Sequence, residues 1–111
     1  MRPPVSTNEL IVVATEHYGS YFQGLGSGLM DCELVREPTN QFDANAIMVF
    51  QGKWQRGYLP ASKAEKYAPA LDRAGGRLET VLRTDSEHAF VNLPTPSELV
   101  EWLEQSGHLP D

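Results

Sequence analysis

The fold of this chain is decided by the stretch Arg36-Glu37-Pro38-Thr39-Asn40-Gln41-Phe42-Asp43-Ala44-Asn45-Ala46-Ile47-Met48-Val49. This stretch joins two strand-like runs, Met30–Arg36 and Asn45–Gln51, by a loop that holds a proline, two amides, an aromatic ring and a carboxylate. Pro38 fixes its own φ and restricts the residue before it, and Asn and Asp side chains hydrogen-bond nearby backbone groups. The residues alone therefore predict a hairpin corner stabilised by Asx turns.

The sequence on either side of this loop predicts a mainly β domain with two helices. Apolar and polar residues alternate in several short runs, which is typical of half-buried strands. Pro60 suits the first position of a helix, Pro69 predicts a kink or two short helices, and Thr95-Pro96-Ser97-Glu98 forms a capping box. Strands are expected at Glu9–His17, Met30–Arg36, Asn45–Gln51, Trp54–Leu59, Arg77–Arg83 and Glu87–Leu93, with helices at Ala61–Ala74 and after Thr95. This order of elements fits a six-stranded, partly open barrel resembling an OB-fold.

A second motif, Gly57-Tyr58-Leu59-Pro60, follows the first at the right distance and in the right order. Together the two motifs resemble the signature of the HIRAN domain, a small β-barrel module found in some DNA-repair helicases and as a standalone bacterial protein. The resemblance implies the same barrel and no enzymatic activity of its own. We expect a flexible N-terminus at 1–8, a HIRAN-like domain at 9–107 and a tail at 108–111.

The resemblance also implies a partner, since HIRAN domains of fork-remodelling helicases are readers of single-stranded DNA 3′ ends. A ring presented by a loop, such as that of Phe42, can stack on a base, a contact worth about 1–3 kcal/mol. The carboxylate of Asp43 is a good acceptor for a sugar hydroxyl and a poor neighbour for a phosphate. The alternative is that Phe42 plugs the barrel end and Asp43 caps the turn. The expected nucleic-acid-binding residues are His17, Tyr18, Asn40, Phe42, Asp43, Tyr58 and Phe90.

The individual roles of the remaining site residues follow from their side chains. Asn40 can donate to a phosphate or a base edge, whereas Asn45 is expected to fix the loop. The hydroxyl of Tyr58 can reach a phosphate oxygen. Phe90 fits an aromatic position of the family pocket, and burial in the core is its alternative.

The chain departs from the family at Glu16-His17-Tyr18, where DNA-binding relatives carry a basic residue followed by two aromatic residues. Nine Lys and Arg against fifteen Asp and Glu give a net charge of −6. Such a chain should not coat a duplex, but it can hold one or two terminal nucleotides. The competing hypothesis is a protein-interaction module whose acidic surface meets a basic partner. The two hypotheses differ in the charges that they expect around Phe42. The nucleic-acid hypothesis is favoured if the cations gather there, namely Arg36, Lys53, Arg56 and Arg83. It is weakened if the carboxylates dominate there, namely Glu16, Glu33 and Glu37.

Length and composition exclude several other classes of protein. The 111 residues allow one domain with one core. No apolar run approaches the roughly 20 residues of a membrane helix. The N-terminus lacks the apolar core of a signal peptide, and the single cysteine, Cys32, is expected to be a buried or half-buried thiol, so we expect a cytoplasmic protein. His and Cys spacings predict no metal site, and the sequence offers no cofactor motif and no catalytic constellation.

Overall fold

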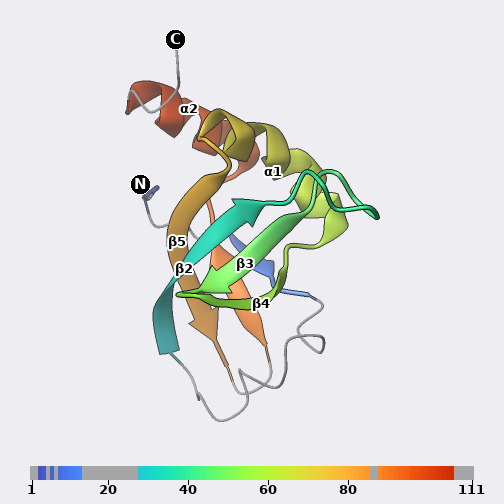
Figure 1. Ribbon diagram of the computed structural model, residues 1–111. Helices are drawn as coiled ribbons and strands as arrows, with labels where there is room; N and C mark the ends of the chain where they lie inside the picture. Colours follow the sequence, from blue (N-terminus) through green and yellow to red (C-terminus); the bar gives the residue numbers. More distant parts are fainter. Residues whose placement is uncertain (1–2, 5, 7, 14–27, 86–87, 107–111) are drawn as a thin grey trace.

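The computed structural model describes residues 3–4, 6, 8–13, 28–85 and 88–106, and it contains six strands and two helices in this part of the chain (Figure 1). The strands are β1 (Glu9–Ile11), β2 (Gly28–Arg36), β3 (Ile47–Gln51), β4 (Trp54–Tyr58), β5 (Arg77–Thr84) and β6 (Ala89–Asn92). The helices are α1 (Ala61–Arg73) and α2 (Pro96–Gln105). The prediction of a mainly β chain with two helices is therefore confirmed.

The six strands form one antiparallel sheet in the order β1-β6-β5-β2-β3-β4. β2 pairs with β5 along eight residues and with β3 along four, and β5 and β2 are the two middle strands. An isolated bridge then links the two edges of the sheet: the N–H of Val13 donates to the carbonyl of Tyr58 at 2.8 Å, and Tyr58 N–H donates back at 3.0 Å. The sheet is thereby curled into the OB-like barrel that the sequence predicts.

The core lies between the inner face of the curled sheet and the two helices, which lie together across one end of the barrel (Figure 1). The alternation of the strands explains this, because every second side chain of β5 points inward. Cys32 is among the buried residues, as expected. The fully buried core side chains include Leu34, Val49, Leu71, Leu82, Val91, Leu99 and Leu103.

The helix predictions are partly corrected by the structure. Pro60 is the N-cap of α1, one residue before the first helical position. The alternative of two short helices is wrong, since α1 is one element with Pro69 inside it. Pro69 lies on the exposed side of α1, where water can satisfy the backbone carbonyl that loses its partner. The capping box of Thr95 and Glu98 is confirmed in both directions, with Pro96 as the first residue of α2.

The strand boundaries also shift by a few residues. β1 ends at Ile11, and the rest of its expected range reaches residues 14–17, outside the described part of the chain. β2 begins two residues earlier than expected, at Gly28, because it continues to pair with β5 as far as Thr84. β3 begins only at Ile47, because the backbone before it belongs to the loop.

A buried phenol joins α1 to the two neighbouring chain segments that precede β1 and follow β6. The side chain of Tyr67 is 2% exposed, and its hydroxyl donates to the carbonyl of Pro94 at 2.6 Å. The same hydroxyl accepts a hydrogen bond from Asn8 Nδ2 at 3.1 Å. Burial raises the pKa of Tyr67 to about 12, although the hydrogen bond from Asn8 lowers it.

This pKa predicts a loss of stability in alkaline solution. An unfolded tyrosine ionises near pH 10, so the folded protein holds a proton there that the unfolded chain has lost. The stabilisation is complete below pH 10 and declines as the pH rises towards 12. Urea unfolding at several pH values measures the free energy of unfolding. This free energy should fall less for Tyr67→Phe than for wild type over this range. Equal pH slopes for the two proteins would show that Tyr67 is not the group responsible.

Candidate nucleic-acid interface

The loop between β2 and β3 is organised by the side chain of Asn40. Its Oδ1 accepts hydrogen bonds from the backbone N–H groups of Phe42, at 2.8 Å, and Asp43, at 3.0 Å. Its Nδ2 donates to Glu37 Oε1 at 2.5 Å. One amide therefore fixes the backbone at Phe42 and Asp43 and ties it to the carboxylate of Glu37, as Asn side chains do in turns.

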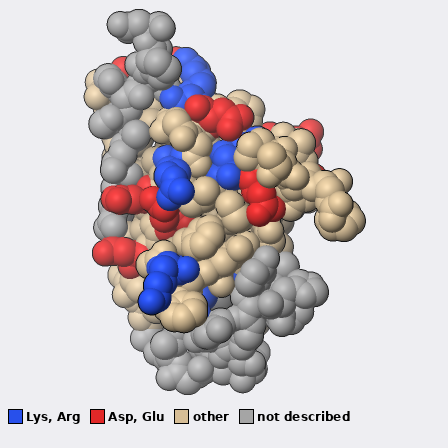
Figure 2. Space-filling view, viewed as in Figure 1, with Lys and Arg blue, Asp and Glu red and all other residues tan. Residues whose placement is uncertain are grey.

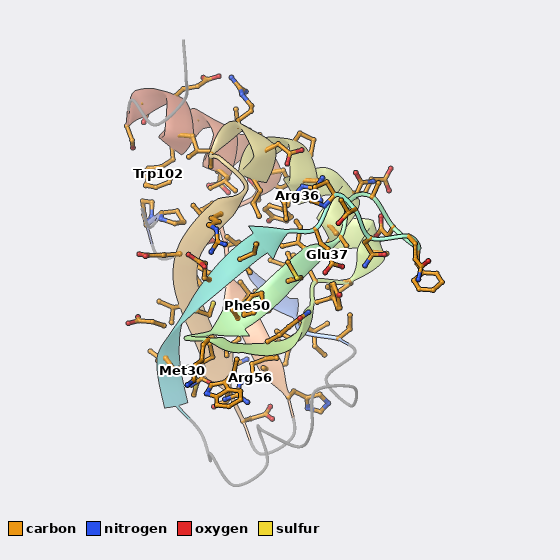
Figure 3. All side chains as sticks on the ribbon, viewed as in Figure 1. Met30, Arg36, Glu37, Phe50, Arg56 and Trp102 are labelled. Atoms are coloured by element: carbon orange, nitrogen blue, oxygen red, sulfur yellow. The ribbon has the colours of Figure 1, made fainter. Side chains whose placement is uncertain are left out.

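Arg36 anchors the returning half of the same loop. Its guanidinium donates to the carbonyls of Ala46, at 2.8 Å, and Ala44, at 3.0 Å, while Nε pairs with Asp72 of α1 at 2.9 Å. The Arg36 side chain is only 8% exposed. Figure 3 shows Arg36 and Glu37 side by side at the base of the loop. The loop is thus attached to both the sheet and α1.

Glu37 connects the loop to β4. Besides the bond from Asn40, its Oε1 accepts a hydrogen bond from the hydroxyl of Tyr58 at 3.0 Å. From the sequence, Glu37 is expected only as an unfavourable charge, and its role as a hydrogen-bond acceptor is not predicted. The signal was present, because an acidic residue directly before Pro38 is part of the motif that carried the resemblance.

Phe42 projects from this rigid loop into solvent, with 89% of its side chain exposed. The alternative in which Phe42 plugs the barrel end is therefore wrong, because the Asn40 hydrogen bonds hold the loop tip away from the core. The alternative for Asp43 is confirmed: its Oδ1 accepts the N–H of Asn45 at 2.9 Å and caps the turn. Within the described part of the chain, the second oxygen of Asp43 accepts no hydrogen bond.

The structure brings four of the expected site residues to a single open pocket of about 380 Å³. Asn40, Phe42 and Asp43 come from the β2–β3 loop, and Tyr58 comes from the end of β4. Val13, whose bridge closes the barrel, and Ala61, the first residue of α1, complete the lining. The pocket therefore lies where three chain segments meet, beside the N-terminus of a helix that has no side-chain cap.

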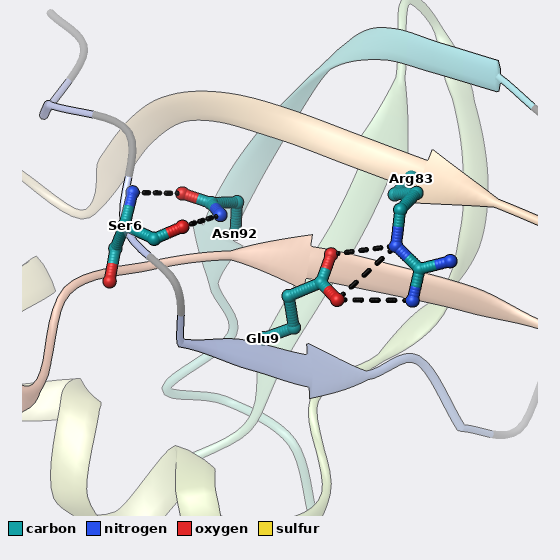
Figure 4. A network of polar contacts seen from close by, with 4 residues as sticks. All are labelled: Ser6, Glu9, Arg83 and Asn92. Carbon is teal, nitrogen blue, oxygen red and sulfur yellow. Dashed lines mark hydrogen bonds and ion pairs between the residues drawn. The ribbon is translucent and has the colours of Figure 1, made fainter.

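Two of the four cations that could have lined this pocket are used in ion pairs elsewhere. Arg36 is bound to Asp72 and to loop carbonyls, as described above. Arg83 forms a two-pronged pair with Glu9 on β1, with Nε at 2.9 Å from Oε2 (Figure 4). This pair raises the pKa of Arg83, first through the hydrogen bonds from its guanidinium to Glu9.

The other two cations lie at the far side of the sheet. Lys53 is in the turn between β3 and β4, with Nζ 5.3 Å from the ring centre of Trp54. Arg56 is buried and donates from Nε to Gln51 at 2.9 Å, and Figure 3 shows it at the opposite end of the barrel from Glu37. On the face seen in Figure 2, Lys and Arg alternate with Asp and Glu rather than forming a basic stripe. Neither cation lines the pocket.

The remaining predictions have mixed outcomes. His17 and Tyr18, together with Glu16, lie outside the described residues. Phe90 is on β6, half-buried, with the guanidinium carbon of Arg83 4.6 Å from its ring centre, and it does not line the pocket. The structure adds a role that was not expected for Asn40, whose side chain fixes the loop, while Asn45 takes part through its backbone N–H. The expected contact of Asn40 with a phosphate or a base edge stays a prediction.

Two kinds of feature are absent from the described residues. These residues contain no group of three or more His, Cys, Asp and Glu side chains placed to hold a metal ion. None of the helices in this part of the chain is both long and apolar enough to cross a membrane.

Comparison with known proteins agrees with the two sequence motifs. The family model of the HIRAN domain matches residues 8–103. Among solved structures, the crystal structure of the HIRAN domain of human HLTF is similar in fold, with a TM-score of 0.53 and 19% sequence identity. That match covers 94% of this chain and 92% of the other. No curated protein sequence matches the chain.

The central position of Asn40 can be tested by stability measurements. Asn40→Ala removes the acceptor of two backbone N–H groups and one donor to Glu37, so it should lower the free energy of unfolding by about 1–2 kcal/mol. Asn45→Ala is the matched control, since the Asn45 side chain is exposed, and it should change stability by less than about 0.5 kcal/mol. Urea unfolding measures both, and similar values for the two variants would contradict the assignment.

Proposed function

The chain belongs to the HIRAN domain family, whose domains are generally DNA-binding modules and are not catalytic by themselves, and we propose that it holds the 3′ end of single-stranded DNA in the pocket at Phe42. Such a module would act on DNA ends in repair or at replication forks. The observation that carries the proposal is the exposure of Phe42, 89%, on a loop in which Asn40 binds the backbone N–H groups of Phe42 and Asp43.

A ring in this position is prepared for stacking. Leaving a Phe side chain in water forgoes about 1.5–3 kcal/mol of burial energy, which a stacked base can recover. Because Asn40 has already fixed the loop, little conformational entropy is lost when the base binds. Every base offers a flat face, so stacking on Phe42 does not require a particular sequence.

Asp43 supports recognition of a strand end rather than of an internal segment. One of its oxygens caps the turn, and the other is available to accept a hydrogen bond from a terminal sugar hydroxyl. A terminal phosphate in the same place would face the charge of Asp43 and that of Glu37 nearby. The pocket therefore favours an unmodified 3′ hydroxyl.

The N-terminus of α1 supplies a positive potential at this pocket. Pro60 provides no side-chain cap and the first turn of α1 contains no acidic residue. The partial positive charge of the first turn thus remains uncompensated beside Ala61, and a backbone phosphate is stabilised at such a position. The hydroxyl at Asp43 and the next phosphate at α1 would together fix the direction of the strand.

The charges around the pocket also set the strength of binding. Because no Lys or Arg is among the described residues that line the pocket, few counterions should be released, and we expect a salt slope of about one to three ions. Affinity should be micromolar or poorer, with little affinity for duplex DNA.

Replacing the exposed ring tests the stacking contact. Phe42→Ala should weaken binding of all short single strands by about 1–3 kcal/mol, whatever their ends carry. Trp54→Ala is the matched control, because it removes another exposed aromatic ring that does not line the pocket. Fluorescence anisotropy at low salt measures both, and equal losses would remove Phe42 from the site.

Replacing the carboxylate tests the recognition of the end. Asp43→Asn keeps an oxygen to cap the turn and removes the charge, so it should reduce the preference for a 3′ hydroxyl over a 3′ phosphate while leaving stability nearly unchanged. Glu65→Gln, an equal change of charge on the exposed face of α1, should keep the preference. If wild type binds both ends equally, or binds no single strand at low salt, end recognition fails. The protein-interaction hypothesis then takes its place.

A further inference from the structure

The backbone of Glu37 is fixed on both sides at the start of the β2–β3 loop. Its N–H donates to the carbonyl of Ala46 at 2.9 Å, and its carbonyl accepts the N–H of Asn40 at 3.1 Å. Pro38, the next residue, disfavours helical backbone at Glu37. The half-buried side chain of Glu37 therefore extends from a fixed point directly after the end of β2.

One oxygen of this side chain holds two residues of the pocket at once. Oε1 of Glu37 accepts hydrogen bonds from Asn40 Nδ2 and from the hydroxyl of Tyr58. Both donors line the pocket, whereas Glu37 does not. Hydrogen bonds to an ionised acceptor are roughly twice as strong as those to a neutral one. Glu37 therefore joins two walls of the pocket from outside it.

The charge of Glu37 is not balanced by an ion pair within the described residues. The neighbouring Arg36 is paired with Asp72, and none of the other described Lys and Arg side chains pairs with Glu37. Asp43, which lines the pocket, adds a second carboxylate nearby. A ligand that carries phosphates is opposed by both charges.

We propose that Glu37 is a specificity-determining residue of this pocket, which positions Asn40 and Tyr58 through its oxygen and disfavours phosphorylated strand ends through its charge. The inference rests on the function proposed above. Its two effects on binding have opposite signs. The hydrogen bonds prepare the pocket for a base, whereas the charge weakens the binding of every strand. It weakens a terminal phosphate most, because that group carries about two negative charges.

Two substitutions separate these effects. The side-chain amide in Glu37→Gln has the shape of the carboxyl group, and its oxygen can accept both hydrogen bonds because it has two lone pairs. Glu37→Ala removes the same charge and the acceptor as well. Wild type compared with Glu37→Gln therefore reports the charge, and Glu37→Gln compared with Glu37→Ala reports the acceptor at equal net charge.

Fluorescence anisotropy at low salt with short single strands measures the effect of the charge. Glu37→Gln should bind a strand with a 3′ hydroxyl about two- to fourfold more tightly than wild type does, and one with a 3′ phosphate about five- to tenfold more tightly. The preference for the hydroxyl should thus fall, and the gains should shrink at higher salt.

Glu101→Gln is the matched control for this change of charge. It removes one negative charge from α2, and Figure 3 shows Trp102 of α2 well apart from Glu37. It should change the affinity for either strand by less than about 1.5-fold, because charges so far apart are screened by salt.

The effect of the acceptor is measured both with and without DNA. Glu37→Ala should bind the hydroxyl-ended strand about three- to tenfold more weakly than Glu37→Gln does. In the free protein, Glu37→Ala should speed hydrogen exchange of the Phe42 and Asp43 amides by about three- to tenfold, because Asn40 loses the partner of its Nδ2. Glu37→Gln should change these rates by less than about twofold. Thermal unfolding checks that both variants are folded.

Separate results would overturn the two parts of the inference. Selection by charge fails if Glu37→Gln binds no more tightly than wild type, keeps the full preference for the hydroxyl, or gains no more than Glu101→Gln. Positioning fails if Glu37→Ala and Glu37→Gln show equal exchange rates at Phe42 and Asp43. If wild type binds no strand at all, the proposed function and selection by charge both fail, and the exchange rates still decide whether Glu37 positions the loop.

Discussion

The hydrogen bonds of one side-chain amide, that of Asn40, hold the candidate site together. By binding the N–H groups of Phe42 and Asp43 it sets the direction of the loop tip, and by binding Glu37 it connects this tip to Tyr58 on β4. The exposed ring and the carboxylate beside it would otherwise belong to a mobile hairpin. The same bonds explain why Phe42 stays out of the core although it is a large apolar side chain.

The distribution of charge explains why the acidic composition is compatible with a nucleic-acid module of limited reach. Arg36 and Arg83 are used in ion pairs that join loop to helix and strand to strand, so neither is at the pocket. Among the described residues, what remains there is the rings of Phe42 and Tyr58, the carboxylate of Asp43 and the start of α1, with Glu37 bound to the Tyr58 hydroxyl. Such a set suits one end of a strand and cannot follow a long phosphate backbone.

Much of the fold could be predicted from the sequence because each signal was local. Strand alternation and the capping box at Thr95 depend on residues close together in the chain, and both are confirmed. The bridge between Val13 and Tyr58 could not be predicted, since it joins segments that meet only when the sheet curls. The sequence could not show that α1 continues through Pro69, because this depends on Pro69 lying on the side of the helix that faces water.

The sequence predicted which residues meet at the site better than it predicted their hydrogen-bond partners. The resemblance selected Asn40, Phe42, Asp43 and Tyr58, and the structure brings these four residues to one pocket. It did not identify Glu37 as the acceptor that joins the loop to β4, because composition gives the sign of a charge and not its hydrogen-bond partners. Asn40 acts through its side chain and Asn45 through its backbone N–H. The path of the backbone between the two residues decides which group is used, and no residue pattern specifies that path.

The most direct test of this account is a nuclear magnetic resonance titration of the ¹⁵N-labelled chain with a short single strand that ends in a free 3′ hydroxyl. The account predicts that the amide signals that move are those of Asn40, Phe42, Asp43, Tyr58 and Ala61, with little change along α2. Signals that move mainly on α2 or on the outer face of β3, or no movement at low salt, would contradict it.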